Sequence, residues 1–264
     1  MIPRLAPGLL AVPWLLFAWS RADDVDKLQG LLNAGEAPSQ YQIRFATRRF
    51  DPAGKLLSAS TNAATFSRTP FLLVSRRSQT PDVVTLFTSN AAWERFDALG
   101  LLNRYPTTPA GLQKHGQGLL VALSAARFQA WTYPAAFARM PIERMERGPD
   151  RSDAILGLPG RKLALLRCDG SLSKLLGIYT CKTAPDPSKI SERSPEVLEA
   201  YLFGNHRPVA GLPYPLPWRL TGFEGGRQVY EAEILSFSLE ALSVDQILAS
   251  EVAAYEKKYV VKER

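Results

Sequence analysis

Residues 41–54 read YQIRFATRRFDPAG, and this stretch decides the fold class. Its apolar side chains Tyr41, Ile43 and Phe45 alternate with less apolar residues, which is the period of a strand with one buried face. Residues 51–54 then combine Asp, Pro and Gly, the composition of a tight turn, before a second extended run begins. The stretch therefore predicts an antiparallel β-hairpin with one face directed at the core.

Short extended runs separated by turn-forming residues continue along much of the chain. A Gly-Gly pair at 225–226 stands between two of them and is the clearest hairpin signal in the sequence. Successive short strands joined by tight turns indicate a curved antiparallel sheet. Beyond the first hairpin, strands are expected at residues 63–66, 71–76, 83–88, 163–168, 178–182, 218–224 and 227–239.

Helices are expected at fewer places. The spacing of apolar residues predicts helices over 23–34 and 119–131, the second within a helical insertion at about 101–159. Serines predict two more helix starts, one for a helix over 194–201 and one in a capping box near the C-terminal end. We predict one α+β domain over residues 23–264, a curved antiparallel sheet with helices covering one face.

The first 22 residues have the pattern of an export signal. Arg4 precedes an apolar stretch that ends at Trp19. Ser20 and Ala22 then supply small residues at the two positions that a signal peptidase reads, and we expect cleavage after Ala22. The apolar stretch is shorter than the roughly 20 residues of a stable membrane-spanning helix, although an uncleaved anchor is the alternative. We expect the mature protein in the periplasm or secreted.

The charge of the mature chain is mildly basic. Removal of Arg4 and Arg21 with the signal lowers the formal net charge from +7 to +5. The basic residues are scattered and do not form a stripe with interleaved aromatic residues, so no nucleic-acid partner is expected.

Few residues suggest covalent chemistry. His115 and His206 are far apart and stand in no metal-ligand pattern, so we expect no metal and no cofactor. Glu143 and Asp150 are candidate paired carboxylates of a hydrolase, but they lie in a charged stretch that is typical of a solvated surface.

The two cysteines, Cys168 and Cys181, fit an exported protein. In an oxidising compartment such a pair most often closes a local disulfide, which we expect here. Two unpaired buried thiols are the alternative, because spacing does not establish geometry.

Apolar and aromatic side chains are abundant on the expected strands. They either fill an ordinary core or line a cavity that a strongly curved sheet leaves open for a lipid or another apolar ligand. On the second interpretation the ligand-binding residues are Tyr41, Ile43, Phe45, Phe66, Phe71, Leu73, Leu86, Trp93, Trp218 and Ile234.

Several segments resemble the periplasmic lipoprotein-carrier family typified by LolA, with its LolB- and LppX-like relatives. The resemblance is carried by the opening segment, the first hairpin and the stretch Phe66-Ser67-Arg68-Thr69-Pro70-Phe71, and also by residues 88–97, 216–220, the Gly-Gly hairpin and 242–248. It implies an unclosed β-barrel covered by helices, with a hydrophobic cavity for acyl chains. Arg68 matches a basic residue that in this family contacts the helical lid across the cavity, although a surface arginine at a strand end is the alternative.

We therefore expect an exported envelope protein that binds a lipid or acyl chain in a hydrophobic cavity, in lipoprotein carriage or sorting, without covalent chemistry. Its expected partners are a lipid or an acylated protein, with an envelope membrane or protein as a further partner. The alternatives are an exported carboxylate-dependent hydrolase and a structural envelope interaction protein without a ligand.

Overall fold

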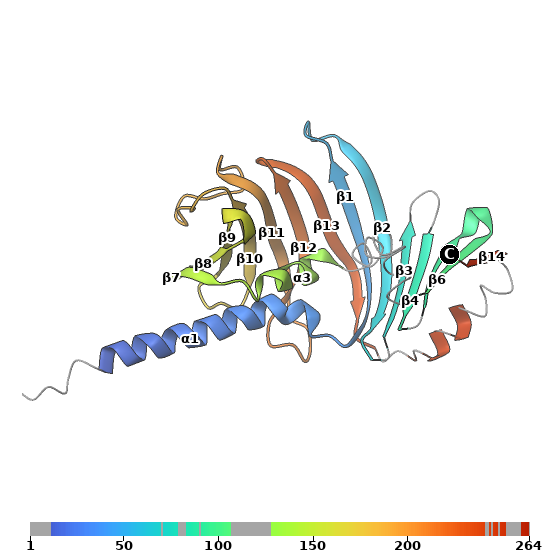
Figure 1. The fold of residues 1–264 in the computed structure, drawn as a ribbon, viewed down its shortest axis with the longest axis horizontal. Coiled ribbons are helices and arrows are strands. Elements are labelled where there is room, and N and C mark those ends of the chain that lie inside the picture. The colour runs from blue at the N-terminus through green and yellow to red at the C-terminus, as the bar shows by residue number, and fades with distance from the viewer. Residues whose placement is uncertain are drawn as a thin grey trace, which may run out of the picture.

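The computed structural model describes residues 12–69, 71–78, 83–89, 91–106, 128–240, 243, 245–247, 249–251 and 260–263. These residues form one curved sheet of 14 strands, which Figure 1 shows in side view. Neighbouring strands are antiparallel except for β14 (Val260–Glu263) and β6 (Leu101–Pro106), which run parallel. The predicted fold class, an antiparallel curved sheet that does not close into a barrel, is confirmed.

The other strands follow one another along the chain and mostly pair with their sequence neighbours. They are β1 (Gln40–Phe50), β2 (Leu56–Ser67), β3 (Leu72–Ser78), β4 (Val83–Thr88), β5 (Ala91–Phe96), β7 (Ile142–Arg147), β8 (Arg151–Gly157), β9 (Leu163–Asp169), β10 (Leu175–Cys181), β11 (Val197–Arg207), β12 (Leu216–Glu224) and β13 (Arg227–Ser238). Their order across the sheet is β14-β6-β5-β4-β3-β2-β1-β13-β12-β11-β10-β9-β8-β7. The β1–β13 pair therefore joins the strands from the two halves of the chain at the middle of the sheet.

Both predicted hairpins are confirmed. In the β1–β2 turn, the Asp51 carboxylate accepts hydrogen bonds from the backbone N–H groups of Ala53 at 2.9 Å and Lys55 at 2.8 Å, and Gly54 has a φ of +82°. In the β12–β13 turn both glycines, Gly225 and Gly226, have positive φ, which the two-residue turn of a twisted hairpin requires.

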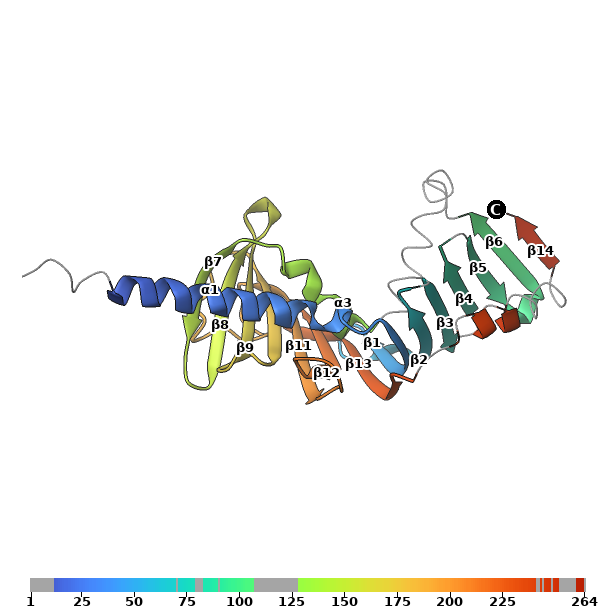
Figure 2. The same ribbon diagram turned by 90° about the horizontal axis from the view of Figure 1, so that it is seen from below.

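The helices α1 and α3 lie on one face of the sheet, which we call the concave face. Helix α1 (Val12–Asn33) continues into the short 3-10 helix η1 (Ala34–Glu36), and α3 (Gln129–Thr132) continues into η3 (Pro134–Phe137). Figure 2 shows α1 running across the strands at the β7 end of the sheet and extending past β7, the last strand. Two further 3-10 turns, η2 (Asp97–Leu99) and η4 (Pro159–Arg161), join strands.

Helix α1 confirms the opening helix predicted over 23–34. Leu28, Leu31 and Leu32 lie on its buried side and pack in the same core cluster as Phe45 of β1 and Trp131 of α3. Cleavage within the first residues stays a prediction. Among the described helices, none has both the length and the apolar character needed to span a bilayer.

The helix predicted over 194–201 is wrong, because β11 begins at Val197. The Ser194 hydroxyl instead accepts a hydrogen bond at 3.0 Å from the backbone N–H of Ser191, so it stabilises the loop before the strand. The branched and aromatic residues that follow favour an extended chain, and Val197, Ala200 and Phe203 are buried along it.

The segment predicted as a helical insertion contains strands at both ends. It opens with β6 and closes with the β7–β8 hairpin, and its described helical part is limited to α3 and η3. Residues 107–127, which hold most of the helix predicted over 119–131 and also His115, lie outside the described residues. The strand β8 is buried continuously from Ser152 to Leu156, as in a strand with both faces covered, so its apolar residues lack the alternation that would have identified it.

The predicted disulfide is wrong, since both Cys168 and Cys181 are free and buried. In the β9–β10 pair Cys168 faces Leu175, while Cys181 faces Leu163 at the other end. These positions lie five residues apart along β9, about 17 Å in an extended strand, whereas a disulfide needs Cα atoms within about 7 Å. The two thiols also lie in different core clusters.

Candidate functional site

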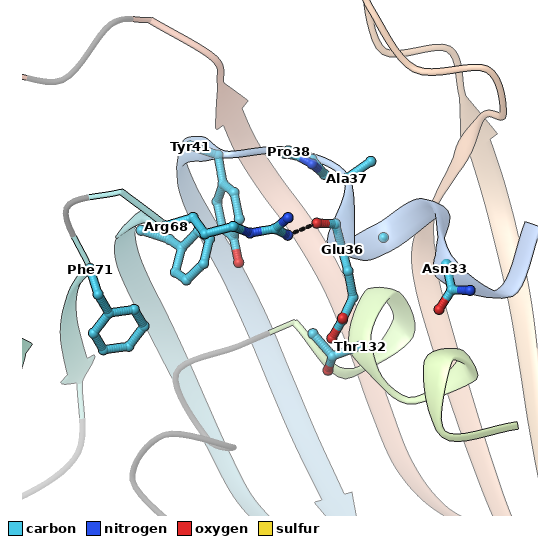
Figure 3. Close-up of a pocket in the computed structure, with 10 residues that line it drawn as sticks. Asn33, Glu36, Ala37, Pro38, Tyr41, Arg68, Phe71 and Thr132 are labelled. Carbon is cyan, nitrogen blue, oxygen red and sulfur yellow. Dashed lines mark hydrogen bonds between the residues drawn. The ribbon is translucent and has the colours of Figure 1, made fainter. Parts of the chain in front are cut away.

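A cleft opens where α1 ends against the concave face. Its volume is about 450 Å³, and it lies between the segment that follows α1 and the ends of β1 and β2 (Figure 3). The helical side contributes Asn33, Gly35, Glu36, Ala37, Pro38 and Thr132, and the sheet side contributes Tyr41, Phe66, Arg68 and Phe71.

The sheet side of the cleft is an aromatic wall. Tyr41 and Phe66 stand opposite each other on β1 and β2 with ring centroids 5.0 Å apart, and Phe71 meets Phe66 edge to face at 6.3 Å. Tyr41 and Phe66 are buried, whereas Phe71 is partly exposed at the mouth. Three aromatic rings in this arrangement present apolar surface to whatever occupies the cleft.

The wall continues into the aromatic core of the concave face. Tyr41 contacts Trp131 edge-on at 5.8 Å and Phe237 at 6.0 Å, and Trp131 meets Phe237 at 4.9 Å. The indole N–H of Trp131 donates a 2.7 Å hydrogen bond to the carbonyl oxygen of Pro217. This bond fixes α3, and with it Thr132, beside the cleft.

Arg68 connects the two sides of the cleft. Its guanidinium donates a hydrogen bond to the backbone carbonyl of Glu36 in η1 (Figure 3), and its backbone N–H donates to the carbonyl of Ser39 at 2.8 Å. Carbonyl groups at a helix end lack partners within the helix and carry the negative end of its dipole, so a cation is favoured there. Arg68 thus contacts η1 in the structure, and its role as a lid contact stays a prediction.

Gly35 sets how closely η1 approaches α3. A Cβ atom at this position would lie 2.6 Å from the carbonyl carbon and 2.7 Å from the Cα of Trp131, both backbone atoms. Only glycine permits this approach, which places the Glu36 carbonyl within reach of Arg68.

The concave face brings most of the predicted ligand-binding residues together. Three of them, Tyr41, Phe66 and Phe71, line the cleft itself. Trp218 is partly buried beside the same core, with the guanidinium carbon of Arg207 4.1 Å from the centre of its ring. Four more are buried in the core behind the wall: Ile43, Phe45, Leu73 and Ile234.

The remaining two predicted residues, Leu86 and Trp93, lie on the opposite face, which we call the outer face. They belong to a separate cluster with Leu72 and Val74, against which Ile247 packs from the C-terminal helical segment. Along β4 the alternation turns Phe87 to the concave face and therefore Leu86 away from it. Neither residue is part of the cleft.

Sequence reasoning did not identify the helical side of the cleft. Glu36 acts through its backbone carbonyl, which no residue type can signal. Gly35 and Pro38, just after the helix, are the only marks of this segment in the sequence, and both are typical of a helix end.

The carboxylates considered for a hydrolase do not form a pair. Glu143 and Asp150 are exposed and lie beyond opposite ends of the Arg144–Arg147 run of β7, which alone spans about 10 Å. Asp153 is buried and bound at 3.0 Å by Arg167. The two catalytic carboxyl groups of glycosidases lie roughly 5–10 Å apart. The arrangement of Glu143 and Asp150 therefore does not favour the hydrolase.

His206 has a structural position on β11. Its Nε2 lies 2.8 Å from the carbonyl oxygen of Leu175, and its burial lowers the pKa of the ring, opposed by this hydrogen bond. Within the described part of the chain, no group of three or more His, Cys, Asp or Glu residues is arranged to hold a metal ion.

No protein-family model matches the sequence, and no curated protein sequence matches it. Among solved structures, the chain is similar to a LolA superfamily protein from Nitrosomonas europaea, with 11% sequence identity and a TM-score of 0.48, over 86% of this chain and 96% of that chain. A DUF1329 family protein from Desulfovibrio piger is similar to it as well, with 9% identity and a TM-score of 0.48, over 89% of this chain and 98% of that chain.

Proposed function

We propose that the cleft binds an apolar chain, such as the acyl chain of a lipid or of an acylated protein, and that the protein carries or sorts this ligand without covalent chemistry. The aromatic wall of Tyr41, Phe66 and Phe71 along an opening of about 450 Å³ is the observation that supports it. Ligand sites in proteins typically measure about 300–1,000 Å³ and are lined mostly by apolar and aromatic groups.

Burial of the chain would provide the affinity. Each methylene removed from water contributes about 0.8 kcal/mol, so roughly ten methylenes contribute about 8 kcal/mol before the cost of ordering the ligand. Release then requires an acceptor, a membrane or a second protein, that offers the chain equal burial.

Residues 33–38 would serve as the lid over this site. Arg68, an exposed charged group, contacts this lid through a hydrogen bond to the Glu36 carbonyl. A hydrogen bond to a charged group stabilises the folded state by about 3 kcal/mol at most. This contact helps to hold the lid closed, together with the packing of Ala34 in the core and of Gly35 against Trp131, which opening would also have to break.

The cellular setting is part of the proposal. An export signal in residues 1–22 would place the mature chain in the periplasm or outside the cell, where it meets lipids and acylated proteins of the envelope. The ligand is then a lipid or an acylated protein, and an envelope membrane or protein is the donor or acceptor.

The test uses Phe71, because it is only partly buried and its loss spares the core. Phe71→Gln should weaken binding of the uncharged apolar fluorophore N-phenylnaphthylamine by about tenfold, as expected when a large apolar contact is lost. Leu99→Gln is the matched control, since Leu99 is 68% exposed on η2 and outside the cleft, and this variant should bind like the wild type.

Native mass spectrometry of the protein purified from an envelope fraction, followed by lipid extraction, complements this test. A lipid or acylated species that copurifies with the wild type and is lost in Phe71→Gln supports the proposal. A folded wild type that carries no lipid and does not bind the fluorophore contradicts it and favours the structural envelope protein.

A further inference from the structure

The outer face of the sheet carries a row of arginines. Cross-strand pairing places Arg44 of β1 opposite Ala63, Ala63 opposite Arg76 of β3, Arg76 opposite Val84, and Val84 opposite Arg95 of β5. Residues that stand directly opposite each other share a face, so the three arginines point to the same side. Adjacent strands lie about 4.8 Å apart, which spaces consecutive arginines by roughly 10 Å with one small or apolar residue between them.

A pocket of about 310 Å³ lies along this row. We call it the arginine pocket; it is lined by Arg44, Arg76, Arg77, Arg95, Thr61 and Asp97 among others. A neighbouring pocket of about 200 Å³ shares Arg44 and Arg76 and adds the hydroxyl groups of Thr65, Ser236 and Ser238. The two hollows thus combine guanidinium donors with hydroxyl donors on one surface.

The carboxylates at the arginine pocket do not balance its charge. Asp97 pairs with Arg95 at 2.6 Å, and Glu251 of the C-terminal helical segment pairs with Arg76. Arg44 is exposed, and among the described residues no ion pair joins it to a carboxylate. Arg77 follows Arg76 directly on β3, so its side chain turns to the concave face and adds no charge to this row. The contact of Glu251 also shows the chemistry of the site, since a carboxylate of the chain itself already binds one arginine of the row.

We propose that the arginine pocket binds a phosphate group. Guanidinium groups present planar forks of N–H donors that match the oxygens of phosphate, and several of them around one small hollow favour this anion over a single carboxylate. The pocket lies on the face opposite the aromatic wall, so this inference goes beyond the proposed apolar site and does not depend on it. The phosphate is carried either by a lipid headgroup or by a soluble ester.

Calorimetric titration with inorganic pyrophosphate tests the site. The wild type should bind it, and Arg44→Gln should weaken binding by about tenfold or more, the effect of removing a hydrogen bond between charged groups. Arg139→Gln is the matched control, since Arg139 is exposed between η3 and β7, outside both pockets, and the charge change is the same. This control should bind pyrophosphate like the wild type.

Glu251→Gln provides a change in the opposite direction. Without the carboxylate that occupies Arg76, the affinity for pyrophosphate should rise. The proposal is overturned if pyrophosphate does not bind, if Arg139→Gln weakens binding as much as Arg44→Gln, or if Glu251→Gln lowers the affinity.

Vesicle flotation separates the two sources of phosphate. If the wild type floats with vesicles of phosphatidylcholine and phosphatidylglycerol, but Arg44→Gln does not, the group belongs to a lipid headgroup. If the wild type binds pyrophosphate and floats with neither these vesicles nor vesicles of phosphatidylcholine alone, the group belongs to a soluble ester. Both results support the phosphate site, and the absence of pyrophosphate binding overturns it.

Discussion

Substitution of Gly35 by alanine should separate η1 from α3. The added methyl would lie 2.6 Å and 2.7 Å from backbone atoms of Trp131, about 1 Å closer than van der Waals contact allows. Trp131 is held by its bond to Pro217 and is 2% exposed, so η1 has to move instead. Overpacking of this kind costs about 1–3 kcal/mol, which for a chain of this size lowers Tm by roughly 2–12 °C.

The same displacement should loosen the lid. Because the next carbonyl, that of Glu36, accepts the hydrogen bond of Arg68, a shift of η1 breaks this contact and exposes the aromatic wall. Urea unfolding followed by tryptophan fluorescence measures the stability, and N-phenylnaphthylamine exchange measures the rate at which the cleft opens. We expect a lower unfolding midpoint and faster exchange.

Gly30→Ala, in the preceding helix α1, is the control. The atoms nearest to a Cβ there would be those of the Tyr214 side chain, from 3.1 Å, which can move, and alanine gains about 1 kcal/mol of helix propensity over glycine. This variant should be as stable as the wild type or more stable. If Gly35→Ala unfolds at the wild-type midpoint and exchanges the fluorophore at the wild-type rate, the argument from close approach is refuted.

Two predictions concern ionisable groups outside the cleft. Burial raises the pKa of the Cys181 thiol to about 11 and also raises that of Cys168, so both should react with Ellman's reagent only after unfolding, and fast reaction of the native protein would contradict this. Partial burial raises the pKa of Asp169, but hydrogen bonds from Ser173, Ser171 and two backbone N–H groups outweigh it and lower the pKa overall. The resulting stability is present above the unfolded pKa and is lost as the pH falls through the folded pKa, so urea unfolding of Asp169→Asn should depend less on acidic pH than that of the wild type, and equal slopes would argue against it.

The hairpins could be predicted because their turns are encoded locally. The Asp51 carboxylate and Gly54 define one turn, and Gly225 with Gly226 defines the other, without help from distant residues. The helix predicted from Ser194 is wrong for the converse reason. A serine can stabilise a loop as well as a helix start, and only the partner, here the N–H of Ser191, distinguishes the two.

The two cysteines illustrate that the pairing register of β9 with β10, and not the spacing of Cys168 and Cys181 in the sequence, decides whether a disulfide can form. The Asp169 carboxylate accepts hydrogen bonds from the backbone N–H groups of Ser173 at 2.7 Å and Lys174 at 2.8 Å, which fixes the β9–β10 turn directly after Cys168. Cys168 therefore pairs with Leu175, and Cys181 lies at the far end of its strand. The Asp-Gly pair at 169–170 marks a turn in the sequence, but a two-residue turn on it would pair Cys168 with Ser171, so the observed register depends on the longer loop that Asp169 holds.

The cleft could be predicted only on its sheet side, because aromatic residues on strands have a visible period whereas the lid contributes backbone atoms. Because side chains alternate between the two faces of a strand, β1 contributes to both proposed sites. Tyr41 points to the aromatic wall, and Arg44, three residues later, points to the arginine pocket on the opposite face. Since side chains alternate strictly, a one-residue shift in the pairing of β1 with β2 would exchange the two faces, burying Arg44 in the core and exposing Phe45. The turn built on Asp51 and Gly54, which sets this register, is therefore as important for both proposed sites as the residues that line them.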